Sequence, residues 1–248
     1  MLAPTPGRLR YLVVIVGLLA GLTGCAVEHA SSVTPEGLLT VLGPFPGFSP
    51  SDLPGDWTLE SNGDITEKQL GVITRDGLPA LRISNGKAPF IIVRRTKAMV
   101  LTTPYLSWSW NIQSPSAPGF HPVRIIVGFH GGNPTGRSWG GQVFKFFGNP
   151  LPPHDRALSL TWGESALQRG TMDLSQRETP GAAPRYTVRG GRENADTWWL
   201  ETVDLADLYA KAWPDDDISH THITFIGIAA AGGRPPAPAY VSGILLSR

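Results

Sequence analysis

Short apolar runs separated by glycine and proline are the feature that most constrains the fold of this chain. The 248 residues include 29 glycines and 23 prolines, and these are scattered without a collagen-like period. Glycine and proline at such positions mark turns. Many short strands joined by such turns are typical of sandwiches and barrels, so the sequence predicts an all-β domain.

The runs between the turns predict a dozen short strands and little helix. The expected strands are Trp57–Glu60, Gln69–Thr74, Ala80–Ser84, Phe90–Arg95, Tyr105–Ile112, Val123–His130, Gln142–Phe147, Ala157–Trp162, Arg185–Arg189, Trp198–Asp204, Ile223–Ala229 and Ala239–Leu246. Apolar residues at helical spacing predict a short helix over Leu205–Trp213, and a weaker pattern suggests another near Asp64–Leu70.

Alternation within two of these strands predicts which side chains face the core. One face of the first strand carries Leu106, Trp108, Trp110 and Ile112, and the other carries Tyr105, Ser107, Ser109 and Asn111. Val123, Ile125, Val127 and Phe129 share a face of the second strand. Strands with one apolar and one polar face suit two antiparallel sheets packed face to face.

The N-terminus has the order of a secretory signal peptide. Arg8 and Arg10 precede an uncharged stretch, Tyr11–Leu22, which is shorter than the roughly 20 residues that span a bilayer. The run Leu22-Thr23-Gly24-Cys25 resembles the lipobox of bacterial lipoproteins. The resemblance implies cleavage between Gly24 and Cys25 and acylation of Cys25 by diacylglyceryl and palmitate-like chains. The alternative is an incidental cysteine beside an ordinary cleavage site.

Residues 1–24 are therefore expected to be a signal peptide, residues 25–44 a lipidated cysteine with a flexible tether, and residues 45–248 one domain. Loss of residues 1–24 removes two arginines and no acids, which changes the formal net charge from +1 to −1. Lysine and arginine are dispersed along the chain, which disfavours a nucleic-acid partner. Ala26, in place of an aspartate after the cysteine, favours the outer membrane facing the periplasm.

Several collinear segments resemble the bacterial domain-of-unknown-function 3047 family. They are Leu81–Ser84, the Leu-x-Trp-x-Trp strand Leu106–Trp110, Arg124–Phe129, Leu158–Trp162, Trp199–Tyr209 and Val241–Ile244. The resemblance implies a jelly-roll β-sandwich of the galactose-binding kind with one or two short helices, and no particular activity. Where an acidic run is expected in relatives, this chain has Ala229–Gly233, so a metal or acid-dependent ligand is not expected at that loop.

The most metal-like cluster is Asp215 and Asp217 followed by His220 and His222. A His-x-His pair on a strand points both imidazoles to one face, and nearby carboxylates could complete a site. A solvated turn before a strand explains the same residues without a metal. Loop acids also suit a structural calcium ion, but no specific motif supports one, and no cofactor is expected.

The glycine-rich loop Gly131–Gly141 and the pair Trp198 and Trp199 are the candidate ligand-binding elements. In the loop, Arg137 could donate bidentate hydrogen bonds and Trp139 could stack on a ligand. Adjacent tryptophans on a strand point to opposite faces, so one is expected inside and Trp198 is a candidate platform. A flexible hairpin and ordinary sheet packing are the alternatives.

No catalytic residues are expected, since the chain has neither a Gly-x-Ser-x-Gly elbow nor a free thiol. The pairs Glu164 with Glu178 and Glu193 with Asp196 fit surface charge better than catalysis. The favoured hypothesis is a lipid-anchored, non-catalytic module that binds a glycan or another envelope component. The alternatives are a polysaccharide hydrolase, which needs two facing carboxylates, and a structural lipoprotein that binds a protein partner.

Overall fold

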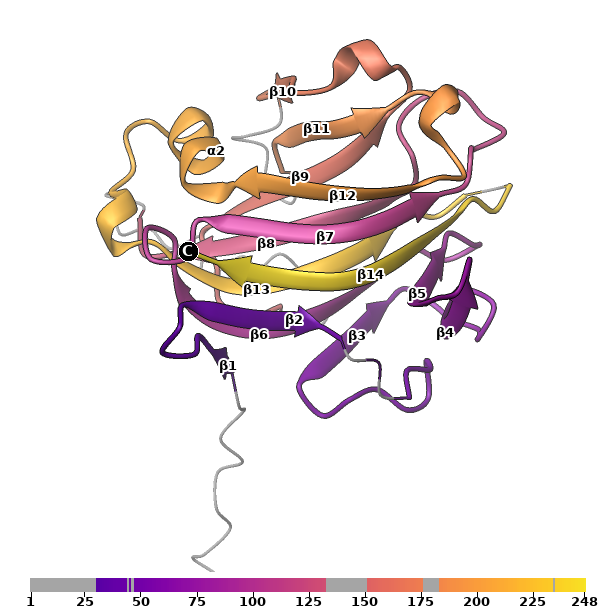
Figure 1. Ribbon diagram of the computed structural model, residues 1–248, viewed down its shortest axis with the longest axis horizontal. Helices are drawn as coiled ribbons and strands as arrows, with labels where there is room; N and C mark the ends of the chain where they lie inside the picture. The colour runs from indigo at the N-terminus through magenta and orange to yellow at the C-terminus, as the bar shows by residue number, and fades with distance from the viewer. Residues whose placement is uncertain (1–29, 44, 46, 133–150, 176–182, 234) are drawn as a thin grey trace, which may run out of the picture.

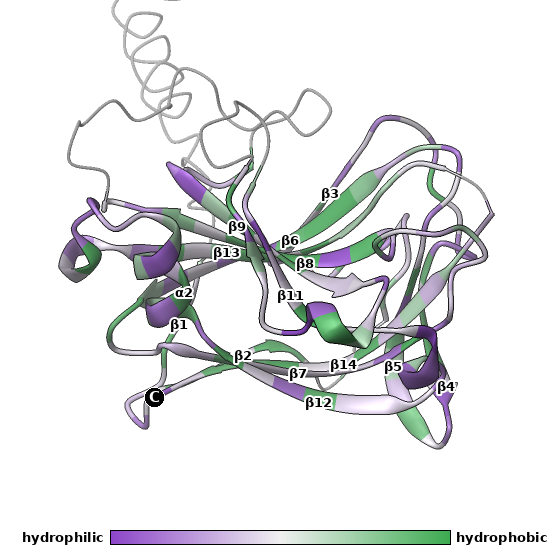
Figure 2. Ribbon diagram, turned by 90° about the horizontal axis from the view of Figure 1, so that it is seen from above, coloured by the Kyte–Doolittle hydropathy of each residue, from purple (hydrophilic) through white to green (hydrophobic). Residues whose placement is uncertain are grey.

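Two β-sheets packed face to face form the body of the protein (Figure 1). The computed structural model describes residues 30–43, 45, 47–132, 151–175, 183–233 and 235–248. Seen from above, the sheets form two separate layers (Figure 2). Among the described residues no helix is both long and apolar enough to cross a bilayer.

The larger sheet has eight strands within the described residues. Its path runs β1–β6–β13–β8–β9–β11–β10, and β3 also pairs with β6. The bounds are β1 Ser31–Ser32, β3 Trp57–Ser61, β6 Phe90–Met99, β8 Val123–His130, β9 Arg156–Gly163, β10 Met172–Asp173, β11 Arg185–Gly190 and β13 His222–Ala230. Two pairings, β1 with β6 and β9 with β11, are parallel.

The smaller sheet has six strands in the described part of the chain. Its path runs β12–β7–β14–β5–β4, with β2 beside β14. The bounds are β2 Leu38–Leu42, β4 Leu70–Arg75, β5 Leu78–Ser84, β7 Tyr105–Ile112, β12 Trp198–Asp204 and β14 Pro238–Ser247. All pairings within this sheet are antiparallel.

The chain crosses repeatedly between the two layers. It passes from β5 to β6, from β6 to β7 and from β7 to β8, and later from β11 to β12, β13 and β14, changing sheet each time. Such crossings in a double-layered antiparallel fold characterise a jelly roll. The predicted all-β jelly-roll sandwich is confirmed.

The core lies between the sheets and follows the predicted alternation. Leu106, Trp108, Trp110 and Ile112 are at most 1% exposed. Trp110 makes edge contacts with Trp108 on its own strand and with Trp162 of the opposite sheet, at 5.4 and 5.7 Å between ring centroids. Burial of such large aromatic side chains is a major source of stability.

The larger sheet is apolar on both faces, which alternation alone did not predict. Val123, Ile125, Val127 and Phe129 belong to the main core as expected. Ile126 points to the other face and joins a second buried cluster with Ile91, Val93, Leu151, Ala157, Phe225 and Ala229. The sequence of a strand that is covered on both faces is a continuous apolar run, and Ile125-Ile126-Val127 is such a run.

One α-helix, α2 over Leu205–Ala212, is present in the described residues, together with the 3₁₀ turns η2 Ala166–Gln168, η3 Arg192–Asn194 and η4 Ile218–His220. Asp204 caps α2 by accepting hydrogen bonds from Ala206 N–H and Asp207 N–H. The weaker expected helix near Asp64–Leu70 is wrong. A single turn there, with Leu70 N–H donating to Thr66 O at 3.1 Å, leads directly into β4.

The expected tether is also corrected, because the folded body begins before Phe45. Strands β1 and β2 lie within residues 25–44, and Val41 and Leu42 are 0% and 2% exposed. Arg94 secures β2 by donating to the carbonyl oxygens of Thr40 and Val41, at 2.7 and 2.6 Å. Cys25 and the expected strand Gln142–Phe147 lie outside the described residues.

Candidate functional site

A polar and aromatic row crosses the outer face of the smaller sheet. Strand register places Trp198 of β12 opposite Asn111 of β7, Asn111 opposite Tyr240 of β14, and Tyr240 opposite Arg82 of β5. Directly opposed residues in antiparallel strands share a face. These four residues are called the Trp198 row.

Trp198 and Trp199 take the opposite faces that the sequence predicts. Trp199 packs against the main core and its Nε1–H donates to Asn194 O at 2.8 Å. The guanidinium of Arg189 lies over its ring at 3.7 Å. Trp198 is half-buried on the outer face and does not pack against the main core. It is therefore the candidate platform of the pair.

The tip of the β4–β5 hairpin borders the Trp198 row. Asp76 and Gly77 at the turn have φ values of 51° and 80°, as two-residue hairpin turns require. The Arg75 guanidinium lies 4.9 Å above the Tyr240 ring, and Asn111 Nδ2–H donates to Asp76 Oδ2 at 3.4 Å. Asn111, which alternation places on the face away from the core, is fully buried, because a hairpin distant in sequence covers it.

Charges around the row are paired with one another and remain reachable. Arg75 lies 3.5 Å from Asp76 and 3.7 Å from Asp196 in the turn before β12. The side chains of Arg75, Asp76 and Asp196 are 34%, 58% and 53% exposed. A ligand at the row would thus meet one positively charged and two negatively charged groups at this border.

Three buried polar atoms of the row have no hydrogen-bond partner among the described residues. They are Trp198 Nε1 and Arg82 Nε, both donors, and Asn111 Oδ1, an acceptor. An unpaired buried polar group costs about 1–3 kcal/mol, and native structures keep few of them. The Trp198 row therefore carries polar groups that packing alone does not explain.

Beyond the row, the same sheet face carries small polar side chains. The Ser107 and Thr202 hydroxyls hydrogen-bond to each other at 2.8 Å, and the Ser242 hydroxyl donates to Pro79 O at 2.9 Å. Leu200 of β12, which is 72% exposed, lies opposite Ser109 of β7. Hydroxyls beside an exposed aliphatic side chain form a surface that a polar ligand with apolar patches can cover.

A buried ion pair holds the edge of the sandwich below Trp198. Arg189 of β11 and Glu201 of β12 come from different sheets, and Arg189 Nε–H donates to Glu201 Oε1 at 2.5 Å. Trp110 Nε1–H donates to the same oxygen at 3.3 Å. The Glu201 side chain is 3% exposed, so this pair serves to fix β12 rather than to bind a ligand.

Side chains of the predicted metal cluster make local hydrogen bonds instead. Asp217 caps η4, accepts from Ser219 N–H at 2.9 Å, and lies 2.6 Å from His220 Nδ1. These contacts hold the pKa of the Asp217 carboxyl at about 2. His222 Nδ1 lies 3.1 Å from His220 O, and Asp215 is exposed. No group of three metal-ligating side chains occurs among the described residues.

Other predicted residues are not brought together within the described part of the chain. Arg137, Trp139 and Glu178 lie outside it. Glu193 is exposed, and Asp196 is bound to Arg75. The carboxylate pairs considered for hydrolysis therefore show no facing arrangement among the residues that the structure describes.

Sequence reasoning missed the residues that border Trp198. One signal was present for the hairpin tip, because Asp76-Gly77 between two apolar segments is a strong hairpin signal. Tyr240 and Asp196 carry no such signal. They reach the row through strand register and long-range folding.

No protein-family model matches the chain, and no curated protein matches it. Solved structures of similar shape include the family 30 carbohydrate-binding module of a cellulosomal cellulase of Clostridium thermocellum, at 14% identity and TM-score 0.39, over 85% of this chain and 96% of that one. The family 11 module from Clostridium thermocellum, in complex with a β-1,3-1,4-mixed-linked tetrasaccharide, has 10% identity and TM-score 0.38, over 86% and 97%.

An adhesin domain of Lys-gingipain from Porphyromonas gingivalis has 12% identity and TM-score 0.39, over 85% of this chain and all of that one. These identities and TM-scores are low, so the proposal that follows depends on the residues of this chain alone.

Proposed function

We propose that the protein is a lipid-anchored, non-catalytic module that binds a neutral glycan across the outer face of the smaller sheet. The observation that carries the proposal is the Trp198 row, in which the half-buried Trp198 indole lies in register with Asn111 and Tyr240, and a charged hairpin tip contacts these two neighbours. The proposal combines the favoured sequence hypothesis with a specific surface.

The chemistry of the surface suits a saccharide. A flat aromatic side chain offers an apolar plate with a polar tip, which complements the C–H face and hydroxyl rim of a pyranose ring. Arg75, Asp76 and Asp196 supply donors and acceptors at the border. Few polar groups around an apolar platform are the usual means of orienting a ligand.

Charge balance favours a neutral glycan over an acidic one. Arg75 already faces two carboxylates, and the Arg82 guanidinium donates to Glu67 O at 2.6 Å. An anionic sugar would bring its charge close to Asp76 and Asp196. Like charges in proximity disfavour binding, so uronic acids are expected to bind more weakly than neutral hexoses.

The anchored state is supported by the sequence of residues 8–25. Several acyl chains at Cys25 would hold the protein firmly, because each buried CH₂ contributes roughly 0.8 kcal/mol and a single chain holds only marginally. The Cys25→Ser change is expected to abolish palmitate labelling and to leave unprocessed precursor. Continued labelling of this variant would show that Cys25 is not the acylated residue.

A glycan array probed with three forms of the protein tests the binding proposal. Wild type should bind a set of neutral glycans, Trp198→Ala should lose that signal, and Leu167→Ala should keep it. Leu167 is the matched control because it is 92% exposed and lies on η2, away from the Trp198 row. Absence of binding to any neutral glycan, or equal binding by Trp198→Ala, would contradict the proposal.

A further inference from the structure

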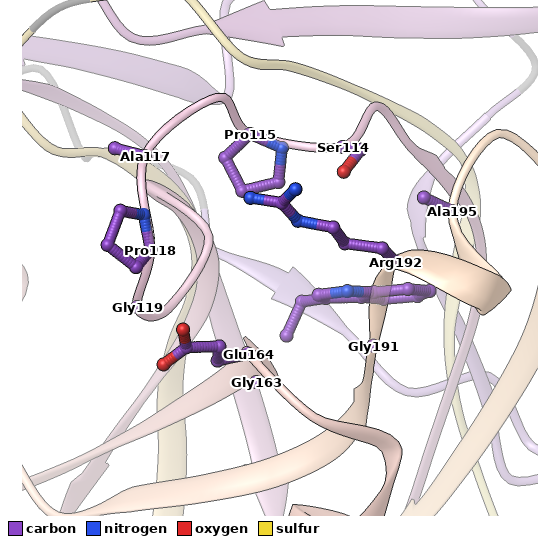
Figure 3. Close-up of a pocket in the computed structure, with 11 residues that line it drawn as sticks. Ser114, Pro115, Ala117, Pro118, Gly119, Gly163, Glu164, Gly191, Arg192 and Ala195 are labelled. Carbon is purple, nitrogen blue, oxygen red and sulfur yellow. The ribbon is translucent and has the colours of Figure 1, made fainter.

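A small pocket lies at the end of the sandwich where β7, β9 and β11 finish (Figure 3), and none of its lining residues belongs to the Trp198 row. Three loops form it: the segment after β7, the turn after β9 and the turn after β11. The space between its walls is about 300 Å³, and this figure includes solvent at the open mouth. The enclosed part is much smaller, so an occupant must be small.

The backbone beneath the pocket is fixed by close glycine packing. Gly191 has a φ of 90°, which favours glycine, and its N–H donates to Gly163 O at 3.2 Å. A Cβ on Gly190 would lie 2.5 Å from Ser165 O and 2.7 Å from Gly163 O. The two turns are thus joined by backbone contact, which sets the spacing of the side chains that they carry.

Each turn is also rigid by itself. A capping box between Ser165 and Gln168 follows Glu164 directly. Arg192 begins η3, which is held by Asn194 Nδ2–H donating to Gly190 O at 2.8 Å. The third wall is secured by His121 N–H, which donates to Trp162 O at 3.0 Å. The pocket is therefore preformed.

Two opposite charges line this pocket without pairing. Glu164 and Arg192 are both exposed, and neither side chain has a hydrogen bond or ion pair to another residue in the described part of the chain. In Figure 3 the Arg192 side chain extends toward Pro115, whereas the Glu164 carboxylate points toward Gly119. Pro115, Ala117 and Pro118 form an apolar wall on one side of the pocket.

We propose that this pocket binds a small zwitterion of the amino-acid class. The ligand ammonium would contact the Glu164 carboxylate. The ligand carboxylate would contact the Arg192 guanidinium, because a guanidinium can donate two parallel hydrogen bonds to one carboxylate. A small apolar side chain would lie against the proline wall. This proposal is independent of glycan binding, because it uses none of the residues of the Trp198 row.

Nuclear magnetic resonance of the purified protein tests the proposal with alanine and two analogues that each lack one charge. Alanine should shift the backbone amide signals of Gly163 and Gly191. Alanine amide, which lacks the carboxylate, and N-acetylalanine, which lacks the ammonium, should each bind about fivefold more weakly, since an exposed ion pair contributes up to about that factor. Both enantiomers of alanine are titrated.

Two variants link the effect to the pocket. Glu164→Gln should bind alanine and N-acetylalanine equally, and Arg192→Gln should bind alanine and alanine amide equally. Arg169→Gln removes an exposed charge that does not line the pocket and should behave as wild type. The proposal is overturned if alanine shifts no pocket amide up to its solubility limit, if the analogues bind as tightly as alanine, or if both variants bind like wild type.

Discussion

Glu201 places a negative charge between the two sheets, where the Arg189 guanidinium and Trp110 Nε1–H donate hydrogen bonds to it. Changing Glu201 to Gln leaves the buried Arg189 guanidinium without its counter-charge. Removing one partner of a buried ion pair costs about 3–5 kcal/mol, so the free energy of unfolding should fall by roughly that amount in urea denaturation.

Glu193→Gln is the control for this substitution, because Glu193 is exposed. A change on the exposed surface should stay within about 0.5 kcal/mol. Equal stability of the two variants would mean that the Arg189–Glu201 pair does not hold the sheet edge.

His121 predicts a pH dependence of stability. It is 3% exposed, its Nδ1 accepts from Val123 N–H at 3.1 Å, and burial lowers the pKa of its imidazole to about 4 from 6.5. Because the unfolded state binds the proton first, stability is lost as pH falls from 6.5 to 4. The shift corresponds to about 3 kcal/mol.

The His121→Gln variant removes this titration. Its free energy of unfolding should therefore fall less between pH 7 and pH 4 than that of wild type, as measured by urea denaturation at each pH. Parallel pH curves for the two proteins would refute the assignment to His121.

At the residue scale, the sequence predicted side chains whose neighbours are their own strand. Trp108 and Trp110 point inward as alternation requires. Asn111 did not follow the prediction, because Asp76 covers it from a hairpin 35 residues earlier. Local periodicity carries no information about which distant segment folds over a sheet face, so the border of the Trp198 row required the structure.

At the element scale, β2 is the segment whose role differs most from the expected tether. A chain that begins at Phe45 lacks three buried aliphatic side chains, Leu39, Val41 and Leu42. Each contributes roughly 1.5–3 kcal/mol when buried. Because domains have only about 5–15 kcal/mol of stability, this chain should be largely unfolded, whereas one that begins at Ala30 should melt like a chain that begins at Cys25.

Thermal unfolding followed by circular dichroism compares the two chains. If the chain that begins at Phe45 and the chain that begins at Ala30 have equal melting temperatures, residues 30–44 act as a tether and not as part of the folded domain.

Strands β7, β8 and β12 were predicted with the correct bounds. β2 was missed because its apolar run, Leu38–Leu42, follows small and polar residues and is closely followed by Pro44 and Pro46. Its strand conformation comes from pairing with β14 and from Arg94. Asp64, Thr66 and Glu67 resemble the start of a helix, but the chain enters strand β4 at Leu70, directly after a single turn.

At the scale of the whole molecule, the proposed anchor implies an orientation. Only residues 26–30 separate Cys25 from β1, a reach of about 20 Å when fully extended. β1 pairs with Thr96 and Lys97 near the end of β6, whereas the pocket of Figure 3 lies beyond Gly163 and Gly191 at the other end of the sandwich. The proposed anchor would therefore hold the β1 end near the membrane and the pocket away from it.

Single fluorophores on introduced cysteines test this orientation in liposomes that contain a headgroup-bound quencher. A probe at Lys97→Cys should be strongly quenched and a probe at Ser116→Cys, in the loop after β7, should not. Equal quenching at both positions would contradict an upright orientation.

The central claim is that the outer face of the smaller sheet binds a glycan. Its most direct test is a titration of the isotope-labelled protein with the neutral glycan that gives the highest array signal, followed by nuclear magnetic resonance of each backbone amide. The largest shifts are expected at Trp198, Asn111 and Tyr240 and at the hairpin tip Arg75-Asp76. Shifts confined to the opposite sheet, or saturable binding that leaves these amides unchanged, would contradict the account.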